Sequence, residues 1–450
     1  MSTNARTEGE LHRPQHPIRF VTAASLFDGH DASINIMRRI LQSQGAEVIH
    51  LGHNRSVDDV VRAVVQEDVQ GVAISSYQGG HMEYFTYLLD RLREEGRGDV
   101  LVYGGGGGVI VPSEIAELHE RGVARIFSPQ DGQRLGLVAM INTMIEACDS
   151  PPDRDGAIDL DGLLGGSERA LSRAISVIEA GHAPESVLTE LRAAAERRHI
   201  PVLGITGTGG SGKSSLTDEL LRRFRLDQSD KVRIAVIAID PTRRRGGGAL
   251  LGDRIRMNTL DSGQVFFRSL ATRSGDDLTG ATVPAALTDV ITAAKAWGAD
   301  LVVVETPGIG QGDSAIVPYV DLPMYVMTPE FGASSQLEKI DMLDFAEIVV
   351  INKFERRGAL DALRDVRRQY ARNRELFHAD LETLPIFGTV AARFNDDGVT
   401  ALYQHLRDRL VEHGLVVDSG LLEPAASKVS SNVGVIVPAS RQRYLAEIAE

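Results

Sequence analysis

The feature that most constrains the fold is the segment Gly-Thr-Gly-Gly-Ser-Gly-Lys-Ser at residues 207–214. It has the spacing of a phosphate-binding loop; an apolar run precedes it at 202–205, and a helix-forming stretch follows at 215–223. Glycines let successive backbone N–H groups and a helix N-terminus point at one anion. A nucleoside triphosphate site is therefore expected rather than a glycine-rich turn without a ligand. The predicted binding residues here are Gly207, Gly210, Ser211, Gly212, Lys213, Ser214 and Ser215. Lys213 would place its charge at the terminal phosphates, and Ser214 would offer its hydroxyl to Mg²⁺.

The bulk composition narrows the class of protein. At 450 residues the chain is too long for one ordinary core, so two or three domains are expected. Its 48 basic and 62 acidic residues give a formal net charge of -14, which argues against nucleic acid or a membrane surface as the main partner. The single cysteine, Cys148, excludes internal disulfides. Residues 1–17 predict a disordered start without the apolar core of a signal peptide, and a cytoplasmic protein is expected.

Residues 18–150 alternate short apolar runs with amphipathic stretches. Strands are predicted at 18–23, 46–51, 72–75, 100–103 and 125–127. Helices are predicted at 32–44, 57–65, 81–95, 112–121 and 132–148. This alternation indicates an α/β fold, a flavodoxin-like five-stranded parallel sheet with strand order 2-1-3-4-5. Ligands of such sheets bind at the carboxyl ends of the strands.

Three loops at those strand ends contain unusual residues. Asp28 and His30 follow the first strand, Ser75 follows the third, and five consecutive glycines at 104–108 follow the fourth. A neutral imidazole is a good ligand for a transition metal, and a carboxylate two residues away can bind its other nitrogen. Ser75 would be a hydrogen-bonding group deep in the cleft, and the glycines would leave room for a bulky ligand. His30 alone could equally be an exposed loop histidine, so the prediction depends on the three loops together.

These residues resemble the signature of the cobalamin-binding domain of methylmalonyl-CoA-type mutases, which reads Asp-x-His-x-x-Gly, then Ser-x-Leu, then Gly-Gly. The resemblance implies that His30 coordinates the cobalt of adenosylcobalamin in place of the cofactor's own benzimidazole base, whose nucleotide tail enters the sheet. Two positions differ from the family, because Ser33 replaces a glycine and Tyr77 replaces a leucine. The residues implied to bind the cofactor are Asp28, His30, Ser33, Ser75, Tyr77, Gly104 and Gly105.

Residues 151–200 are expected to connect this domain to a nucleotide-binding domain at 201–415. The segment 151–166 is rich in Asp, Gly and Pro and predicts a linker, and two amphipathic helices are predicted at 167–180 and 183–199. Further strands are predicted at 233–239, 301–304, 348–351 and 386–389.

Acidic residues follow two of these strands. Asp240 ends the strand 233–239, and Glu305 follows the strand 301–304, three residues before Gly308. Carboxylates that face a phosphate-binding loop are natural partners for Mg²⁺. GTPases carry Asp-x-x-Gly at the second position, and this chain has a glutamate there. The arginine- and glycine-rich loop at 243–252 predicts a mobile switch, as a nucleotide-sensing element requires.

The segment Asn352-Lys353-Phe354-Glu355 indicates recognition of a base. GTPases carry Asn-Lys-x-Asp at this position, and the carboxylate accepts two hydrogen bonds from the guanine edge. Glu355 keeps the carboxylate but places it one methylene further out. Guanine is therefore the expected base, although Glu355 leaves the strictness of that preference open, and all four residues are predicted to line the nucleotide site.

The segment 160–415 resembles the GTPase chaperones of cobalamin-dependent mutases. The resemblance depends on Asp240-Pro241, on Leu251-Gly252-Asp253, on Glu305-Thr306 and on the Gly-Ile-Gly-Gln run at 308–311. It implies catalytic roles for Lys213, Asp240, Asp253 and Glu305, and a nucleotide contact for Arg256. It also implies a magnesium site made by Ser214, Asp240, Asp253 and Glu305, with the Ile239 carbonyl and Thr306 nearby. Gln311 is a weak candidate for the residue that orients the attacking water.

A cobalamin-binding domain followed by this GTPase is the order at the front of fused isobutyryl-CoA mutases. In that family a CoA-binding barrel follows and rearranges isobutyryl-CoA to butyryl-CoA, and no remaining stretch here could form a barrel of about 250 residues. The chain is therefore expected to be a fragment or a split gene, with residues 416–450 as a linker toward the missing mutase domain.

The expected function is that of an adenosylcobalamin-binding, Mg²⁺-dependent GTPase that gates cofactor loading or repair for an acyl-CoA mutase domain or subunit. A homodimer is compatible with the sequence. Two alternatives stay open, a corrinoid-carrier or cobalamin-sensing binding module and a P-loop kinase, although Asn352 and Lys353 argue against the kinase.

Overall fold

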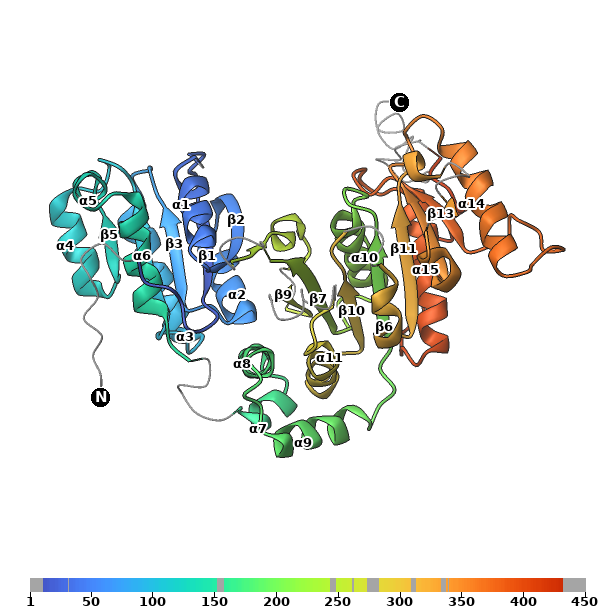
Figure 1. Cartoon of the computed structure of the whole chain (residues 1–450), viewed down its shortest axis with the longest axis horizontal. Coiled ribbons are helices and arrows are strands. Elements are labelled where there is room, and N and C mark those ends of the chain that lie inside the picture. Colours follow the sequence, from blue (N-terminus) through green and yellow to red (C-terminus); the bar gives the residue numbers. More distant parts are fainter. Residues whose placement is uncertain are drawn as a thin grey trace, which may run out of the picture.

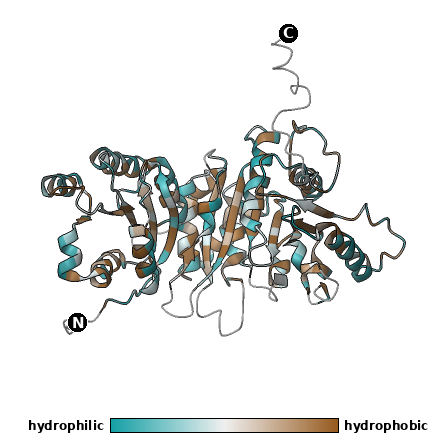
Figure 2. Ribbon diagram, turned by 90° about the horizontal axis from the view of Figure 1, so that it is seen from above, coloured by the Kyte–Doolittle hydropathy of each residue, from teal (hydrophilic) through white to brown (hydrophobic). Residues whose placement is uncertain are grey.

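The computed structural model describes residues 11–30, 32–151, 158–242, 248–260, 263–272, 283–308, 313–332, 337–338 and 340–431. Two parallel sheets stand side by side, each covered by helices on both faces (Figure 1). Most strand residues are buried, because both faces of each sheet pack against helices. Figure 2 shows the result, with strands that are mostly hydrophobic and helices that carry hydrophilic residues on their outer sides.

The first sheet confirms the predicted flavodoxin-like order and adds one strand. Its order is β5-β4-β3-β1-β2-β8, and β8 (Leu250–Leu251) comes from the distant second half of the chain. The other elements are β1 (Arg19–Ser25), α1 (Ala32–Ser43), β2 (Glu47–Arg55), α2 (Val57–Glu67), β3 (Gly71–Ser75), α3 (His81–Glu94), β4 (Leu101–Gly105), α4 (Pro112–Arg121), β5 (Arg125–Phe127), α5 (Pro129–Leu135) and α6 (Leu137–Cys148).

Local sequence explains where several of these helices begin and end. At α2, the Ser56 hydroxyl accepts a hydrogen bond from Asp59 N while the Asp59 carboxylate accepts one from Ser56 N, which is a capping box. The single helix predicted at 132–148 is wrong, because the structure divides this region into α5 and α6. Gly136 lies between them with φ 73°, a left-handed conformation that interrupts the helix.

Three helices connect the two sheets: α7 (Leu160–Leu164), α8 (Glu168–Glu179) and α9 (Glu185–Ala195). The prediction that 151–166 is a linker is wrong at its end, since α7 lies within that range. The Asp159 carboxylate accepts a hydrogen bond from Gly162 N at 2.9 Å and caps α7, and Leu163 is fully buried. Helix α8 packs against α2 on one side and against α11 on the other.

The second sheet has seven strands in the order β13-β12-β11-β6-β10-β7-β9. Its elements are β6 (Val202–Gly207), α10 (Lys213–Asp227), β7 (Ile234–Pro241), η1 (Asp253–Arg256), β9 (Val265–Thr272), α11 (Leu287–Ala296), β10 (Leu301–Glu305), η3 (Asp313–Tyr319), β11 (Leu322–Met327), η4 (Pro329–Phe331), α13 (Met342–Phe345), β12 (Ile348–Asn352), α14 (Ala359–Asn373), β13 (Ile386–Thr389) and α15 (Asp397–Glu412). Strands β9 and β11 were not predicted, because they carry no motif. None of the described helices is long and apolar enough to span a membrane.

Candidate functional site

The carboxyl end of β1 brings the predicted pair Asp28 and His30 together. The buried Asp28 carboxylate accepts a hydrogen bond from His30 N at 2.8 Å, and the same oxygen lies 2.9 Å from His30 Nδ1. Its other oxygen accepts a hydrogen bond from Tyr77 N at 2.6 Å. A carboxylate at Nδ1 favours the neutral tautomer with its proton there, so the Nε2 lone pair is available for a metal. The imidazole is 74% exposed, so a bulky ligand can reach Nε2.

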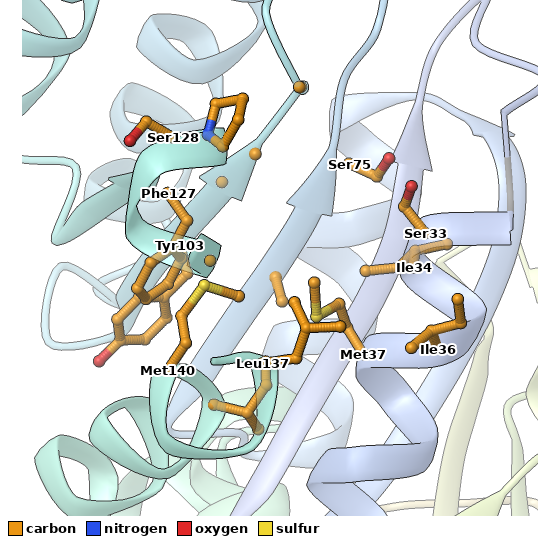
Figure 3. Close-up of a pocket in the computed structure, with 18 of the residues that line it drawn as sticks. Ser33, Ile34, Ile36, Met37, Ser75, Tyr103, Phe127, Ser128, Leu137 and Met140 are labelled. Carbon is orange, nitrogen blue, oxygen red and sulfur yellow. The ribbon is translucent and has the colours of Figure 1, made fainter. Parts of the chain in front are cut away.

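A largely apolar cavity of about 480 Å³ opens beside this loop. Figure 3 shows Met37, Leu137 and Met140 along the cavity and the hydroxyl groups of Ser33 and Ser75 at one end. Within the described part of the chain, the buried Ser75 hydroxyl has no hydrogen-bond partner. A buried hydroxyl that faces an apolar cavity is a natural partner for a polar group of a ligand.

The two positions that differ from the family signature contact each other. Ser33 Oγ lies 2.8 Å from the Tyr77 hydroxyl, and the rings of Tyr77 and His30 have centroids 5.5 Å apart. The pair therefore joins the first turn of α1 to the loop after β3 beside the cavity. Both residues were predicted to bind the cofactor, and both line or flank its expected position.

The two glycines that end β4, Gly104 and Gly105, differ in what they do. A Cβ atom on Gly104 would lie 2.4 Å from the Phe85 ring and 2.6 Å from Ile126, so this glycine is required by core packing. At Gly105 a Cβ atom would make only an ordinary contact, at 3.6 Å from Phe127 O. Gly104 and Gly105 both line the cavity, but the absent side chain of Gly104 does not create it.

The predicted phosphate-binding loop joins β6 to α10, with Gly207, Gly210, Ser211 and Gly212 in or beside the turn and Lys213, Ser214 and Ser215 in the first turn of the helix. Gly212 has φ 86°, and a Cβ atom there would lie 2.6 Å from Asn352 Nδ2. Lys213 Nζ donates a hydrogen bond to Gly207 O at 3.0 Å. The ammonium group therefore lies inside the loop, where a phosphate would be bound.

Two carboxylates, the buried Glu305 and the partly exposed Asp253, converge on the Ser214 hydroxyl. Ser214 Oγ lies 2.7 Å from Glu305 Oε1 and 3.1 Å from Asp253 Oδ1. A hydroxyl has one proton, so it can donate to only one of the two acids. Burial, together with the charge of Asp253, raises the pKa of Glu305 to about 7. Burial, together with the charges of Asp253 and Glu305, also raises the pKa of Asp240.

This arrangement fits a magnesium ion. No three His, Cys, Asp or Glu side chains converge as a preformed metal cluster among the residues that the structure describes. Mg²⁺ does not need such a cluster, because it retains several waters and binds one or two carboxylates together with phosphate oxygens. A divalent cation would also relieve the repulsion that raises the two carboxyl pKa values.

Asn352 connects three parts of the nucleotide site. Its Nδ2 donates a hydrogen bond to Ser211 O at 2.8 Å, and its Oδ1 accepts hydrogen bonds from Ala391 N and Thr389 Oγ1, each at 3.1 Å. Lys353 Nζ donates to Gly210 O at 2.6 Å. Asn352 and Lys353 therefore hold the base-recognition segment against the phosphate-binding loop.

The other two residues of that segment diverge. Glu355 is exposed, as a base-binding carboxylate must be, whereas the Phe354 ring is buried in the core against Gly388. The structure therefore does not support a side-chain contact between Phe354 and a nucleotide.

Three predicted residues remain, namely Ile239 and Thr306 of the magnesium site and Arg256, the predicted nucleotide contact. Ile239 precedes Asp240 within β7. The buried Thr306 hydroxyl donates to Thr206 Oγ1 at 2.8 Å, which holds its side chain in the sheet. Arg256 is 61% exposed and lies 3.4 Å from Asp253.

One supporting residue was missed by the sequence analysis. Thr217 Oγ1 donates to Glu305 Oε2 at 2.9 Å. Its position one helical turn after Lys213 is the signal that could have found it, because residues four apart share a helix face. Gln311 and the arginines at 243–245 lie outside the described residues.

Two family models match the chain. The model described as "Methylmalonyl Co-A mutase-associated GTPase MeaB" matches residues 171–422, and the model described as "B12 binding domain" matches residues 18–135. A fused isobutyryl-CoA mutase from Nocardia farcinica (strain IFM 10152) is 63% identical over 98% of this chain and 41% of its own length. One from Geobacillus kaustophilus (strain HTA426) is 53% identical over 98% of this chain and 40% of its own length.

The chain thus spans about two-fifths of the length of these curated relatives. The GTPase model alone covers more than half of the chain, and the matched ranges coincide with the two sheets and their strand-end sites. The chain belongs to the family of methylmalonyl-CoA mutase-associated GTPases, and it carries a B12-binding domain ahead of the GTPase domain.

Proposed function

We propose that this protein binds adenosylcobalamin through His30, hydrolyses GTP with Mg²⁺, and uses its nucleotide state to gate cofactor loading or repair for an acyl-CoA mutase domain or subunit. The observation that carries the catalytic part is the Ser214 hydroxyl, held between the carboxylates of Glu305 and Asp253 beside the phosphate-binding loop. That geometry suits a metal-bound triphosphate and has no evident structural purpose of its own.

Residues of the chain supply the binding and positioning for GTP hydrolysis. Backbone N–H groups of the loop and the N-terminus of α10 bind the phosphates, and Lys213 compensates their charge. Ser214, Asp240, Asp253 and Glu305 would hold Mg²⁺, directly or through its bound waters, and the ion would neutralise the charge that develops on the phosphate oxygens. Water attacks the terminal phosphorus in line with the leaving oxygen, so positioning and electrostatics provide most of the rate.

The first domain supplies the cobalamin site. His30 Nε2 would be the cobalt ligand, since Asp28 holds the opposite ring nitrogen. The cavity between α1, α5, α6 and the ends of β3 and β4 would accept the nucleotide tail, with the Ser75 hydroxyl as a polar partner. Adenosylcobalamin provides a cobalt–carbon bond whose cleavage starts radical chemistry in a mutase.

The wider reaction is proposed from the relatives. Proteins of which this chain matches about two-fifths are named fused isobutyryl-CoA mutases. We therefore expect this chain to support conversion of isobutyryl-CoA to butyryl-CoA in the cytoplasm, together with a CoA-binding mutase domain. Guanine specificity is proposed from Asn352 and from the exposed carboxylate of Glu355.

Turnover of the full chain tests the proposal. Phosphate release should require Mg²⁺, should be faster with GTP than with ATP, and should need no acceptor molecule. Ser214→Ala should raise the Mg²⁺ concentration for half-maximal turnover at least about ten-fold, because a direct ligand is lost. Ser43→Ala, which removes an exposed hydroxyl on α1, is the matched control.

Two outcomes would reject the proposal. Absence of turnover above background would leave a cobalamin-binding or sensing module, and transfer of phosphate only to an added acceptor would indicate a kinase.

A further inference from the structure

The segment 248–256 belongs to the GTPase domain by sequence but to the B12-binding domain by its backbone pairing. Strand β8 pairs in parallel with β2, with Leu250 opposite Val48 and Leu251 opposite Ile49. Val48 N donates a hydrogen bond to Ala249 O at 2.9 Å. This segment follows β7 and precedes β9 in the sequence. Figure 1 shows it in yellow-green, reaching across to the edge of the first sheet at β2.

Side chains of the same segment enter the core of the B12-binding domain. Ala249 and Leu251 are both fully buried among residues of β1, β2 and α2. Ile255, in the turn that follows β8, packs against Gly52 of β2. The B12-binding domain therefore holds residues 249–251 and Ile255 of this segment.

The turn η1 presents two adjacent side chains to different sites. The Asp253 carboxylate approaches Ser214 at 3.1 Å, in the nucleotide site. Arg254 is 5% exposed and enters the interface between the two domains. Its Nη2 donates a hydrogen bond to Gln66 Oε1 at 2.8 Å, and its Nη1 donates one to Phe267 O at 3.2 Å.

Gln66 is itself held firmly at the end of α2. It is 1% exposed, and its Nε2 donates hydrogen bonds to Val265 O at 3.1 Å and to Glu168 Oε2 at 3.0 Å. The next residue, Glu67, lies 3.7 Å from Arg254 and accepts hydrogen bonds from Ser269 N and Oγ. Buried, hydrogen-bonded charges of this kind tolerate little displacement, since each lost partner is costly.

We infer that Arg254 is a positioning residue of the GTPase site. Its hydrogen bond to Gln66 of the B12-binding domain fixes the position of the neighbouring Asp253 carboxylate. The B12-binding domain thereby completes the magnesium site of its neighbour. Removing the Gln66 acceptor leaves Arg254 with Phe267 O and Glu67 as partners and lets η1 shift, so the magnesium ion must draw Asp253 back into place. The inference rests on the proposed GTPase function.

The test measures Mg²⁺ dependence in the full chain with the variant Gln66→Met, which keeps similar volume and removes the amide. The Mg²⁺ concentration for half-maximal GTP turnover should rise about five-fold or more, within the usual range of coupling between sites. Turnover at saturating Mg²⁺ should fall less than about two-fold, because the bound ion restores the carboxylate position.

A second variant separates positioning from folding. Arg254→Lys keeps the charge but loses the forked pair of donors, whereas Arg254→Met loses both. The Mg²⁺ concentration that Arg254→Lys needs for half-maximal turnover should therefore lie between those of the wild type and Arg254→Met. The melting temperature of each variant identifies one that has lost its fold.

The matched control is Glu179→Gln. Glu179, at the end of α8, spans the same interface and pairs with Arg19 at 3.1 Å and with Arg268 at 2.8 Å. Glu179→Gln should leave the Mg²⁺ concentration for half-maximal turnover within about two-fold of the wild-type value. That change is well below the rise of about five-fold expected for Gln66→Met. An equal shift in this control, or an unchanged Mg²⁺ requirement in Gln66→Met, would overturn the inference.

Equilibrium binding of GTP, titrated by calorimetry at several Mg²⁺ concentrations, separates this inference from the proposed function. A wild-type chain that binds GTP with Mg²⁺ but does not hydrolyse it would reject the proposed GTPase activity, and the binding data would still judge Gln66→Met. A chain that binds no GTP at any Mg²⁺ concentration would reject both.

Discussion

At the scale of single residues, the proposed cobalamin site depends on how Asp28 constrains His30. Because the carboxylate contacts both the backbone N and the Nδ1 of His30, it fixes the loop and the ring together. The same carboxylate accepts a hydrogen bond from Tyr77 N, so the loop after β3 is held in register with the loop after β1. One buried side chain thus arranges two loops around the expected cobalt position.

This geometry predicts different spectra for two substitutions. His30→Ala should abolish the visible spectrum of histidine-ligated cobalamin, because the ligand is lost. Asp28→Asn should retain that spectrum but weaken binding about 10–100-fold, as is usual when a group that orients a metal ligand is removed. A titration of the full chain with cobalamin, followed by visible absorption, measures both effects.

His53→Ala is the control, since His53 is an exposed histidine on the neighbouring strand β2. It should bind cobalamin with the wild-type spectrum and affinity. A wild-type spectrum in His30→Ala would show that another group ligates the cobalt.

At the scale of elements, Asp227 joins the end of α10 to α15 and to the segment after it. Its carboxylate accepts hydrogen bonds from the Tyr403 hydroxyl at 2.6 Å and from Leu422 N at 2.8 Å, and Arg407 lies at 3.1 Å. Burial by itself would raise the pKa of Asp227, but these hydrogen bonds, above all that from Tyr403, outweigh it and lower the pKa below its usual value.

Asp227→Asn should therefore lower the free energy of unfolding by about 1.5–3 kcal/mol at pH 7, the usual range for hydrogen bonds to a charged group. A depressed carboxyl pKa stabilises the fold above the unfolded pKa, and this stabilisation disappears as the pH falls through the folded pKa. The difference between wild type and variant should thus narrow below about pH 4. The fluorescence of Trp297, the single tryptophan, reports the urea transition of the GTPase domain.

Asp418→Asn provides the comparison, because its pair with Lys231 is mostly exposed. Such a pair contributes about 0–1 kcal/mol. Equal losses in the two variants would mean that the buried position of Asp227 has no special effect.

At the scale of the whole molecule, a continuous series of contacts links the two sites. The series runs from Asp253 through β8 to β2, and Asn54 lies near the carboxyl end of β2. The Asn54 side chain accepts a hydrogen bond from Phe27 N at 2.8 Å, and Asn54 N donates to Asp28 O at 3.3 Å. Strand β2 therefore pairs with β8, which leads to Asp253, and also contacts the loop that carries His30, the proposed cobalt ligand.

We expect binding at the two sites to be coupled. Cobalamin should change the affinity for GTP with Mg²⁺ by about five-fold or more, and GTP should change the affinity for cobalamin by the same factor, because linkage is reciprocal. Calorimetric titration of each ligand, with and without the other, measures both factors. In Gln66→Met the factor by which each ligand changes the affinity for the other should fall toward one. Wild-type affinities that are the same with and without the other ligand would contradict the expectation.

The sequence by itself determined the chemical identity of both sites and the α/β fold. Their decisive residues lie in short loops directly after predicted strands, where local chain geometry alone brings Asp28 to His30, or Lys213 and Ser214 to one helix start. Such motifs can be recognised without knowledge of distant contacts.

Only the tertiary structure decided how the two sites are joined. Arg254 and Gln66 are 188 residues apart, and no local pattern indicates that a two-residue strand pairs with another domain. Packing likewise decided that Phe354 lies in the core. It also decided that position 104 needs a glycine, because a Cβ atom there would clash with the Phe85 ring. Propensity and spacing act over a few residues, whereas these arrangements depend on which buried surfaces meet after the chain has folded.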